Sequence, residues 1–230
     1  MKIKAILLDY CGTIAIDIGS FSRLPKSIVS VLHRRGFNVD EEDVAKAIQT
    51  SLDVLPSGLD YSDFARVALT LSKLGLTPKP ELVEDLYKVF SETLMLSTEL
   101  DKDTKDLLAW LKERKLKVGI LSNHGSYDAV RNFLGKHDLL KFLDIVVTSH
   151  HIGWRKPSKQ IVHYGLALLN VKSEESVYVG DDILADIFGA KRAGLRAVWK
   201  ATSSSVTPWI APDAIITRLS QLKELIEQWV

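Results

Sequence analysis

Residues 4–13 read Lys-Ala-Ile-Leu-Leu-Asp-Tyr-Cys-Gly-Thr, an apolar run that stops at an aspartate and a turn pair. A short apolar run bounded by turn residues is typical of a buried β-strand. We expect this strand to end at Asp9 and Gly12-Thr13 to lie in the loop that follows. An aspartate in that place is a candidate functional residue, although alone it equally suits a simple turn.

The chain after residue 101 alternates between short apolar runs and helix-like segments. The expected strands are residues 116–121, 144–148, 176–180, 197–199 and 214–216. The expected helices include residues 107–111, 127–134, 159–169, 183–193 and 219–229. Ser203-Ser204-Ser205 is expected to form a polar loop. Alternating strands and helices predict an α/β fold, with a parallel sheet covered by helices on both faces.

A helical segment separates the first strand from this α/β region. Between residues 22 and 95, apolar residues recur at helical spacing in four stretches without a convincing strand, and Pro56-Ser57-Gly58 breaks the pattern. We predict a core made of residues 1–15 and 98–230, with residues 16–97 as an inserted helical domain. An insertion at this point lies over the carboxyl ends of the strands, where open α/β sheets bind ligands, so we interpret it as a lid.

Composition excludes several classes of function. The 230 residues are 46% hydrophobic and 26% charged, with a formal charge of +1, so no charge excess predicts binding to nucleic acid or an anionic membrane. No apolar run is long enough for a membrane span, and the N-terminus does not resemble a secretory signal. The single cysteine, Cys11, is compatible with a reducing cytoplasm, where we expect the protein as a monomer or homodimer.

Polar residues follow several of the predicted strands at the point where each strand ends. They are Asp9, Ser122, Asn123, Asp181 and Asp182, and Lys156 lies in the loop beyond the third strand. Because the carboxyl ends of parallel strands share one edge of a sheet, we expect these side chains to converge in one crevice.

The chemistry of this set favours phosphoryl transfer. A carboxylate such as Asp9 can attack an electrophilic centre and form a covalent intermediate. Asp9 and Asp181, with Asp182 open as a further ligand, suit Mg²⁺, which binds few carboxylates together with substrate phosphate oxygens. Thr13 and Ser122 can donate hydrogen bonds to phosphate, and Lys156 can neutralise charge on the nucleophile and the phosphate.

Four motifs resemble those of the haloacid dehalogenase superfamily. They are Asp9-Tyr10-Cys11-Gly12-Thr13, Ser122-Asn123, Lys156-Pro157 and Gly180-Asp181-Asp182-Ile183-Leu184-Ala185-Asp186. The resemblance implies a Rossmann-like core with a helical cap, Asp9 as the nucleophile and Lys156 as a catalytic cation. It places Thr13, Ser122 and Asn123 at the substrate. It also implies Mg²⁺ bound by Asp9, Asp181 and the main-chain carbonyl of Cys11, with support from Asp182 or Asp186.

Cys11 departs from the pattern of the superfamily's phosphatases, which usually carry a proton-transferring aspartate there. Other branches carry tyrosine, alanine or threonine at this position, so the first motif does not choose a branch. Dehalogenases usually replace the Gly-Asp-Asp of the fourth motif, whereas Gly180-Asp181-Asp182 is retained here, which favours a metal and a phosphate. A thiol with a pKa near ~8.5 is a poor general acid at neutral pH, and losing such a catalyst costs about 10²–10⁴-fold in rate.

The leading hypothesis is therefore a magnesium-dependent phosphatase of small molecules that forms an aspartyl-phosphate on Asp9. Because of Cys11, we expect slow hydrolysis of alkyl phosphates and faster hydrolysis of aryl or acyl phosphates. Two alternatives remain open: a metal-independent 2-haloacid dehalogenase, and a non-catalytic member that binds a phosphorylated ligand. No motif in the helical insertion identifies the substrate.

Overall fold

The computed structural model describes residues 2–51, 58–201 and 209–229. The predicted break at Pro56-Ser57 and the predicted loop at Ser203-Ser205 lie outside these residues. The chain divides into two compact units, one formed by Met1–Ile16 with Leu100–Val230 and the other by Asp17–Glu99. None of the described helices is both long enough and apolar enough to cross a bilayer.

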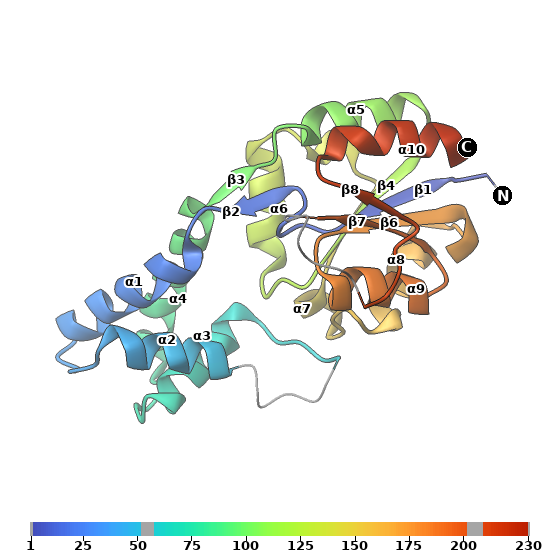
Figure 1. The fold of residues 1–230 in the computed structure, drawn as a ribbon. Coiled ribbons are helices and arrows are strands. Elements are labelled where there is room, and N and C mark those ends of the chain that lie inside the picture. Colours follow the sequence, from blue (N-terminus) through green and yellow to red (C-terminus); the bar gives the residue numbers. More distant parts are fainter. Residues whose placement is uncertain (1, 52–57, 202–208, 230) are drawn as a thin grey trace. The chain divides into compact units, whose positions relative to one another are not determined.

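A six-stranded parallel sheet forms the centre of the first unit (Figure 1). Its strands are β1 (Ala5–Leu8), β4 (Lys117–Ser122), β5 (Ile145–Thr148), β6 (Ser176–Gly180), β7 (Arg196–Lys200) and β8 (Ala214–Ile216). They lie in the order β5-β4-β1-β6-β7-β8, so β1 is paired with strands on both sides. The predicted α/β class is confirmed, and each predicted strand is present.

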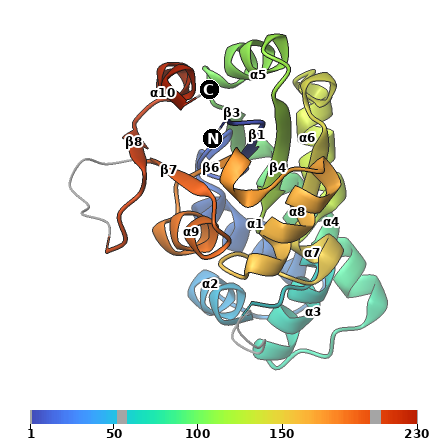
Figure 2. The ribbon, with the colours of Figure 1, turned by 90° about the vertical axis from the view of Figure 1, so that its right-hand side faces the viewer.

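Helices cover both faces of this sheet, because its strands are apolar on both faces. In β1, Ile6 and Leu8 join one hydrophobic cluster while Ala5 and Leu7 join another. The first cluster includes residues of α5 (Thr104–Glu113), α6 (Tyr127–Lys136) and α10 (Leu222–Trp229). The second includes residues of α8 (Lys159–Leu169) and α9 (Gly189–Arg192). Figure 2 shows α5 and α10 on the opposite side of the sheet from α8 and α9.

Short helices complete this unit. They are α7 (Ser149–Ile152), the 3-10 helices Leu140–Phe142, Ser173–Glu175 and Leu219–Gln221, and the π-helix Ile183–Phe188. The predicted helix at 183–193 is therefore a π-helix followed by α9, and the segment ends at Gly194, which has φ +83. A positive φ suits glycine because no Cβ meets the backbone there.

The second unit is the predicted helical insertion. Its helices are α1 (Ser20–Arg34), α2 (Glu41–Thr50), α3 (Asp63–Lys73) and α4 (Pro80–Leu96). Each contributes apolar side chains, among them Leu32, Val44, Leu71 and Phe90, to one hydrophobic cluster. Four helices that share a core in this way explain the four stretches of helical spacing in the sequence.

Two short strands were not predicted. β2 (Ala15–Asp17) and β3 (Thr98–Leu100) pair as a two-stranded sheet at the two points where the chain passes between the units. Each has three residues, which is too short to show a strand periodicity in the sequence.

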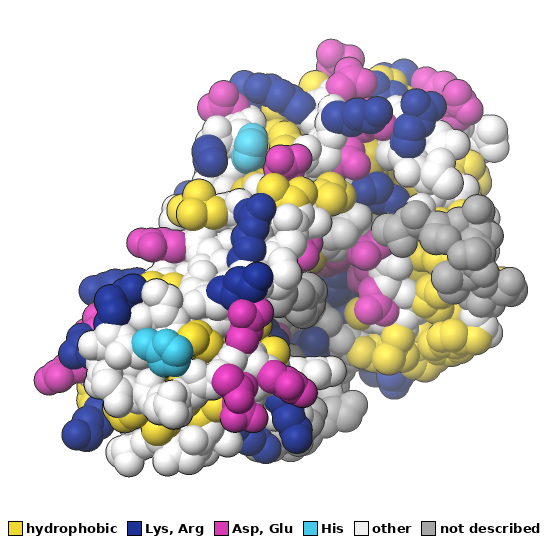
Figure 3. Space-filling view, turned by 60° about the vertical axis from the view of Figure 1, so that its left-hand side comes forward, with side chains coloured by type: hydrophobic (Ala, Val, Ile, Leu, Met, Phe, Trp, Pro, Cys, Tyr) yellow, Lys and Arg dark blue, Asp and Glu magenta, His cyan; other side chains and the backbone are white. Residues whose placement is uncertain are grey.

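Charged side chains are mixed in sign on the surface. On the face shown in Figure 3, Lys and Arg side chains of the described residues are interspersed with those of Asp and Glu. This distribution agrees with the formal charge of +1.

Candidate active site

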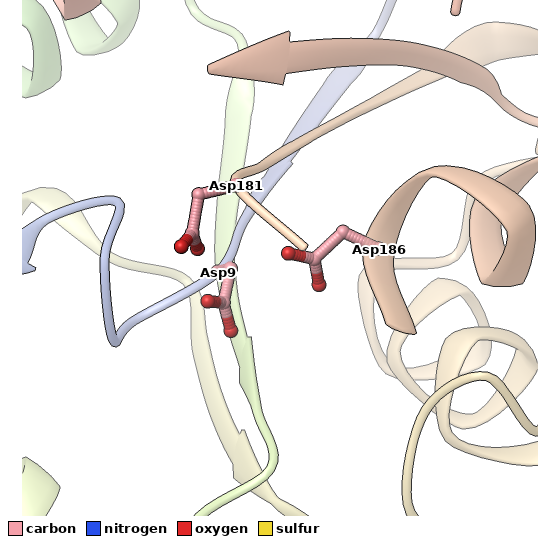
Figure 4. A group of neighbouring side chains, drawn as sticks. All are labelled: Asp9, Asp181 and Asp186. Atoms are coloured by element: carbon pink, nitrogen blue, oxygen red, sulfur yellow. The ribbon is translucent and has the colours of Figure 1, made fainter. Parts of the chain in front are cut away.

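Three aspartates meet at the carboxyl edge of the sheet. Asp9 follows β1, Asp181 follows the neighbouring strand β6, and Asp186 lies on the π-helix after β6. Carboxylate oxygens of the three lie within 4.8 Å of one another. Figure 4 shows the three carboxylates directed toward a common space. The predicted convergence of strand ends therefore brings Asp9 and Asp181 together, with Asp186 as the third acid.

Lys156 lies inside this cluster. Its ammonium nitrogen is 2.5 Å from Oδ1 of Asp9 and 2.6 Å from Oδ1 of Asp186, and the lysine is only 3% exposed. The same nitrogen lies 2.7 Å from the hydroxyl of Tyr178 and 3.1 Å from the carbonyl oxygen of Leu121. A lysine buried this deeply stays charged because carboxylates surround it.

The electrostatics of the cluster favour a cation. Burial, followed by repulsion from Asp186, raises the pKa of Asp9 to about 8 against the opposing effect of Lys156. The same two causes raise the pKa of Asp181 to about 6. Burial would lower the pKa of Lys156, but Asp186 and Asp9 raise it well above its ordinary value. The raised pKa values show that the carboxylates repel one another when they ionise, and a hard divalent cation among these oxygen ligands would relieve that repulsion.

Asn123 holds the main chain of Lys156. Its side-chain oxygen accepts from the Lys156 amide at 2.7 Å, and its side-chain nitrogen donates to the Lys156 carbonyl at 2.9 Å. The side chain predicted to bind substrate is thus engaged in holding the main chain of Lys156.

The two hydroxyls predicted to bind phosphate differ in their surroundings. Ser122 is 1% exposed, and among the described residues no hydrogen-bond partner is found for its Oγ. A buried hydroxyl without a partner is costly, so a ligand that accepts from it would be stabilised. Thr13 is fully buried, and its Oγ1 lies 3.4 Å from Oδ1 of Asp181.

The loop after Asp9 carries Cys11 and Gly12. Cys11 is exposed, and its thiol is not part of the carboxylate cluster. Gly12 has φ +75, and a Cβ at this position would lie 2.1 Å from Oδ2 of Asp181. Only glycine therefore lets the loop pass this close to the Asp181 carboxylate.

Asp182 has a different role from Asp186. Its Oδ1 accepts from the amides of Leu184 and Ala185, both at 2.8 Å, so it caps the π-helix. Asp186 instead joins Asp9 and Lys156, and its Oδ2 accepts from the Asp182 amide at 3.0 Å. Of the two acids left open by the sequence, Asp186 is the one in the cluster.

Three residues near the site were missed in the sequence. The hydroxyl of the fully buried Tyr178 lies 2.9 Å from the carbonyl oxygen of Leu121 and contacts Lys156. Trp199 donates from its indole to the Asp181 carbonyl at 2.9 Å. Lys200 contacts the loop after Asp9. Lys200 directly follows a predicted strand, so the strand-end rule that found Asp9 applied to it as well.

The fold and the acidic site define an α/β protein with a helical insertion after its first strand and a carboxylate cluster at the carboxyl edge of its sheet. A model of the haloacid dehalogenase-like hydrolase family matches residues 18–200, and the chain belongs to this family. The resemblance noted in the four motifs is thereby confirmed.

Relatives with assigned names include phosphatases. Glyceraldehyde 3-phosphate phosphatase from Pyrococcus furiosus is 25% identical over 232 residues, covering 99% of this chain and 94% of that protein. Pyrophosphatase PpaX from Bacillus mycoides is 27% identical over 235 residues, covering 99% of each.

Solved structures share the fold. A 2-haloacid dehalogenase from Pseudomonas syringae superposes with a TM-score of 0.81 at 21% identity, covering 99% of this chain and 100% of that chain. Bacillus subtilis YfnB, solved with bound magnesium, gives a TM-score of 0.72 at 19% identity, covering 99% of this chain and 100% of that chain. Identities this low show a common fold, with the helical region as the family's cap.

Proposed function

We propose that the chain is a magnesium-dependent phosphatase that hydrolyses small phosphorylated molecules through a phosphorylated Asp9. The observation that carries this proposal is the buried Lys156 ammonium, which bridges Asp9 and Asp186 at 2.5 and 2.6 Å. A fixed cation beside a carboxylate nucleophile supplies positioning and charge stabilisation, the main demands of phosphoryl transfer. The phosphatase and pyrophosphatase names of the relatives support the same class of reaction.

The proposed reaction has two steps, and Asp9, Lys156, Ser122 and Thr13 take part in it. An Asp9 carboxylate oxygen attacks phosphorus, and the bond from phosphorus to the leaving oxygen breaks. Water then attacks the phosphorus of the aspartyl-phosphate, the bond from phosphorus to the Asp9 oxygen breaks, and phosphate leaves while the proton of the water passes to solvent, which restores the Asp9 carboxylate. Lys156 offsets negative charge on Asp9 and the phosphoryl group, while Ser122 and Thr13 donate hydrogen bonds to phosphoryl oxygens.

The acids also supply a fitting set of ligands for Mg²⁺. Asp9, Asp181 and Asp186 would hold the ion, together with the main-chain carbonyl of Cys11. The close approach of three carboxylates with a single ammonium among them supports this assignment. When bound, Mg²⁺ supplies charge neutralisation at the phosphate oxygens.

Cys11 sets the preference among substrates. The exposed thiol takes the place of the aspartate that usually protonates the leaving group, so substrates whose leaving group needs little protonation should react fastest. Aryl and acyl phosphates meet this condition, as does pyrophosphate, whereas an alkyl ester such as glyceraldehyde 3-phosphate does not.

We also propose that residues 16–97 form the cap that selects the substrate, while residues 1–15 and 98–230 carry the chemistry. Exchanging residues 16–97 for the corresponding segment of a relative should change the preferred substrate and preserve the requirement for magnesium. A chimera that keeps the original preference would contradict this division.

Phosphate release tests the proposed function. Wild type and the Asp9→Asn variant are assayed on acyl, aryl and alkyl phosphates and on pyrophosphate, with Mg²⁺ or with a chelator. We expect release only from wild type with Mg²⁺. Chelator-insensitive chloride release from 2-chloropropionate would instead identify a dehalogenase, and absence of turnover and of beryllium fluoride binding would identify a non-catalytic ligand-binding protein.

The Cys11→Asp variant tests the substrate preference. We expect it to accelerate hydrolysis of alkyl phosphates by about 10²-fold or more, and to change hydrolysis of acyl phosphates much less. Equal rates of wild type and variant on alkyl phosphates would show that the thiol is no handicap.

A further inference from the structure

Lys200 is a buried lysine that the proposed reaction does not use. It is the last residue of β7 and is 5% exposed. Its ammonium nitrogen lies 3.1 Å from the carbonyl oxygen of Gly12, 2.9 Å from that of Thr13 and 3.1 Å from Oδ2 of Asp101. An ammonium has three N–H donors, so these three acceptors satisfy it completely.

The two carbonyls belong to the turn that follows the nucleophile (residues 10–15, the nucleophile turn). This turn has its own hydrogen bonds, from the Gly12 amide to the Ala15 carbonyl and from the Ala15 amide to the Tyr10 carbonyl, both at 2.8 Å. Lys200 binds the outer carbonyls that these internal bonds leave unused. It therefore fixes where the preformed turn lies in the core unit.

The position of the nucleophile turn controls the space around Asp181. A Cβ on Gly12 would lie 2.1 Å from Oδ2 of Asp181, so the Gly12 backbone packs directly against this carboxylate. A shift of the turn of a few tenths of an ångström would move or release the Asp181 side chain. Lys200 thus acts on the acidic cluster through Gly12, without touching any of the three acids.

Asp101 completes the attachment. It pairs with Lys200, and its own amide donates to the Ile14 carbonyl at 2.9 Å, at the far end of the turn. Burying an ammonium is unfavourable unless its partners compensate, and an apolar side chain at the end of β7 would avoid this cost. The presence of a lysine at this buried position is explained if the nucleophile turn needs the N–H donors of its ammonium group.

We propose that Lys200 is a positioning residue that holds the nucleophile turn against Asp181 and thereby sets the affinity of the acidic cluster for a divalent cation. The proposal rests on the proposed function for its link to catalysis. Its geometric part, the fixing of the turn, can be measured on its own.

The first measurement is amide hydrogen exchange in Lys200→Met, which keeps the length of the side chain and removes the donors. We expect exchange at Gly12 and Ala15 to accelerate at least tenfold, with no change in the central strands. Lys191→Met is the matched control, because it removes a lysine that pairs with Asp213 on the surface. Unchanged exchange at residues 12 and 15 would overturn the proposal, whether or not the protein is a phosphatase.

The second measurement is the affinity for Mn²⁺, a paramagnetic probe for the magnesium site, determined by electron paramagnetic resonance. We expect Lys200→Met to weaken binding at least tenfold, Lys200→Arg to weaken it less, and Lys191→Met to leave it unchanged. Wild-type affinity in a folded Lys200→Met protein would overturn the proposal. If wild type itself binds no Mn²⁺ and hydrolyses no phosphate, the proposed function fails together with the effect on the cation.

Kinetics separate positioning from a general loss of structure. If Lys200 acts through the cation, raising the Mg²⁺ concentration restores much of the activity of Lys200→Met. The reason is that the substitution raises the Mg²⁺ concentration needed for half-maximal activity and leaves the maximal activity largely unchanged. A loss of kcat that is the same at every Mg²⁺ concentration would contradict the proposal. Should Lys200→Met not fold, Lys200→Arg is used for the same three measurements, namely hydrogen exchange, Mn²⁺ affinity and the Mg²⁺ dependence of activity. A guanidinium keeps the charge but cannot place one nitrogen between both carbonyls.

Discussion

Replacing Asp9 by asparagine should inactivate the protein and, without metal, make it more stable. The reason is the pKa of Asp9, which burial and Asp186 raise from 3.8 to about 8. An acid with a raised pKa in the folded state destabilises the fold, because the unfolded chain gives up a proton that the folded protein must keep. Asparagine has no proton to lose and removes this penalty.

The size of the effect follows from the pKa. From pH 3.8 upward, stability falls by about 1.4 kcal/mol for each pH unit, which amounts to about 4 kcal/mol at pH 7. Asparagine keeps an oxygen that can accept from Lys156 but replaces a charged acceptor by a neutral one, and because a hydrogen bond to a charged group contributes about 1.5–3 kcal/mol, part of the gain is lost. We therefore expect Asp9→Asn to gain about 2 kcal/mol at pH 7, or roughly 4–8 °C in Tm for a chain of this length.

The stability difference between Asp9→Asn and wild type should depend on pH. The advantage of Asp9→Asn should be near zero at pH 5, grow up to about pH 8 and level off above it, since the folded carboxyl is then ionised. Thermal unfolding in a chelator across this range measures it. Asp106→Asn is the control, because Asp106 pairs with Lys223 while its side chain is 75% exposed.

With magnesium bound, wild type should be more stable than Asp9→Asn. At a concentration 100 times its Kd, the ion stabilises wild type by about 3 kcal/mol and should stabilise Asp9→Asn much less. The reasoning is refuted if, in the chelator, Asp9→Asn is less stable than wild type at pH 7–8. A stability difference that does not change with pH would refute it equally.

Three further substitutions test the geometry. Gly12→Ala should abolish stabilisation by Mg²⁺ and reduce turnover at least 100-fold, because the new Cβ would lie 2.1 Å from Oδ2 of Asp181; a Mg²⁺ titration of Tm and rate checks this. Ser122→Ala should change the free energy of unfolding by less than about 1 kcal/mol, because the buried Oγ has no partner among the described residues, yet lower kcat/KM about 10–100-fold. Tyr178→Phe should lower the free energy of unfolding by about 1–2 kcal/mol in urea titrations, because it removes the hydroxyl contact to Lys156.

The sequence contains enough information for the sheet and for the acids at its edge. Asp9 and Asp181 follow short apolar runs bounded by turn residues, a pattern typical of buried strands, and parallel strands end at a common edge, so their proximity could be predicted. The participation of Asp186 needed the resemblance to a family. A carboxylate five residues after Asp181 could equally have faced solvent on a helix.

The contacts around Lys156 could not be predicted. Tyr178 stands within an apolar strand, where a phenol usually packs in a core, and nothing in the pattern shows that its hydroxyl faces a lysine. Asn123 reaches the main chain of Lys156 across 33 positions of sequence, a contact that depends on the path of the intervening loop. The strand-end rule places Lys200 near the site, but a lysine after a strand is usually solvated, so the rule does not predict that its side chain is buried.

The central position of β1 also determines how the protein can be made. A ribosome releases residues 5–8 before their neighbours in the sheet, β4 and β6, which end only at residues 122 and 180. At ~5–20 residues per second, the apolar first strand must wait roughly 10–35 s for its second partner. The four inserted helices make mostly contacts local to residues 20–96 and can fold within this interval. During this interval the apolar strand lacks both neighbours in the sheet, and an unpaired apolar strand is prone to aggregate.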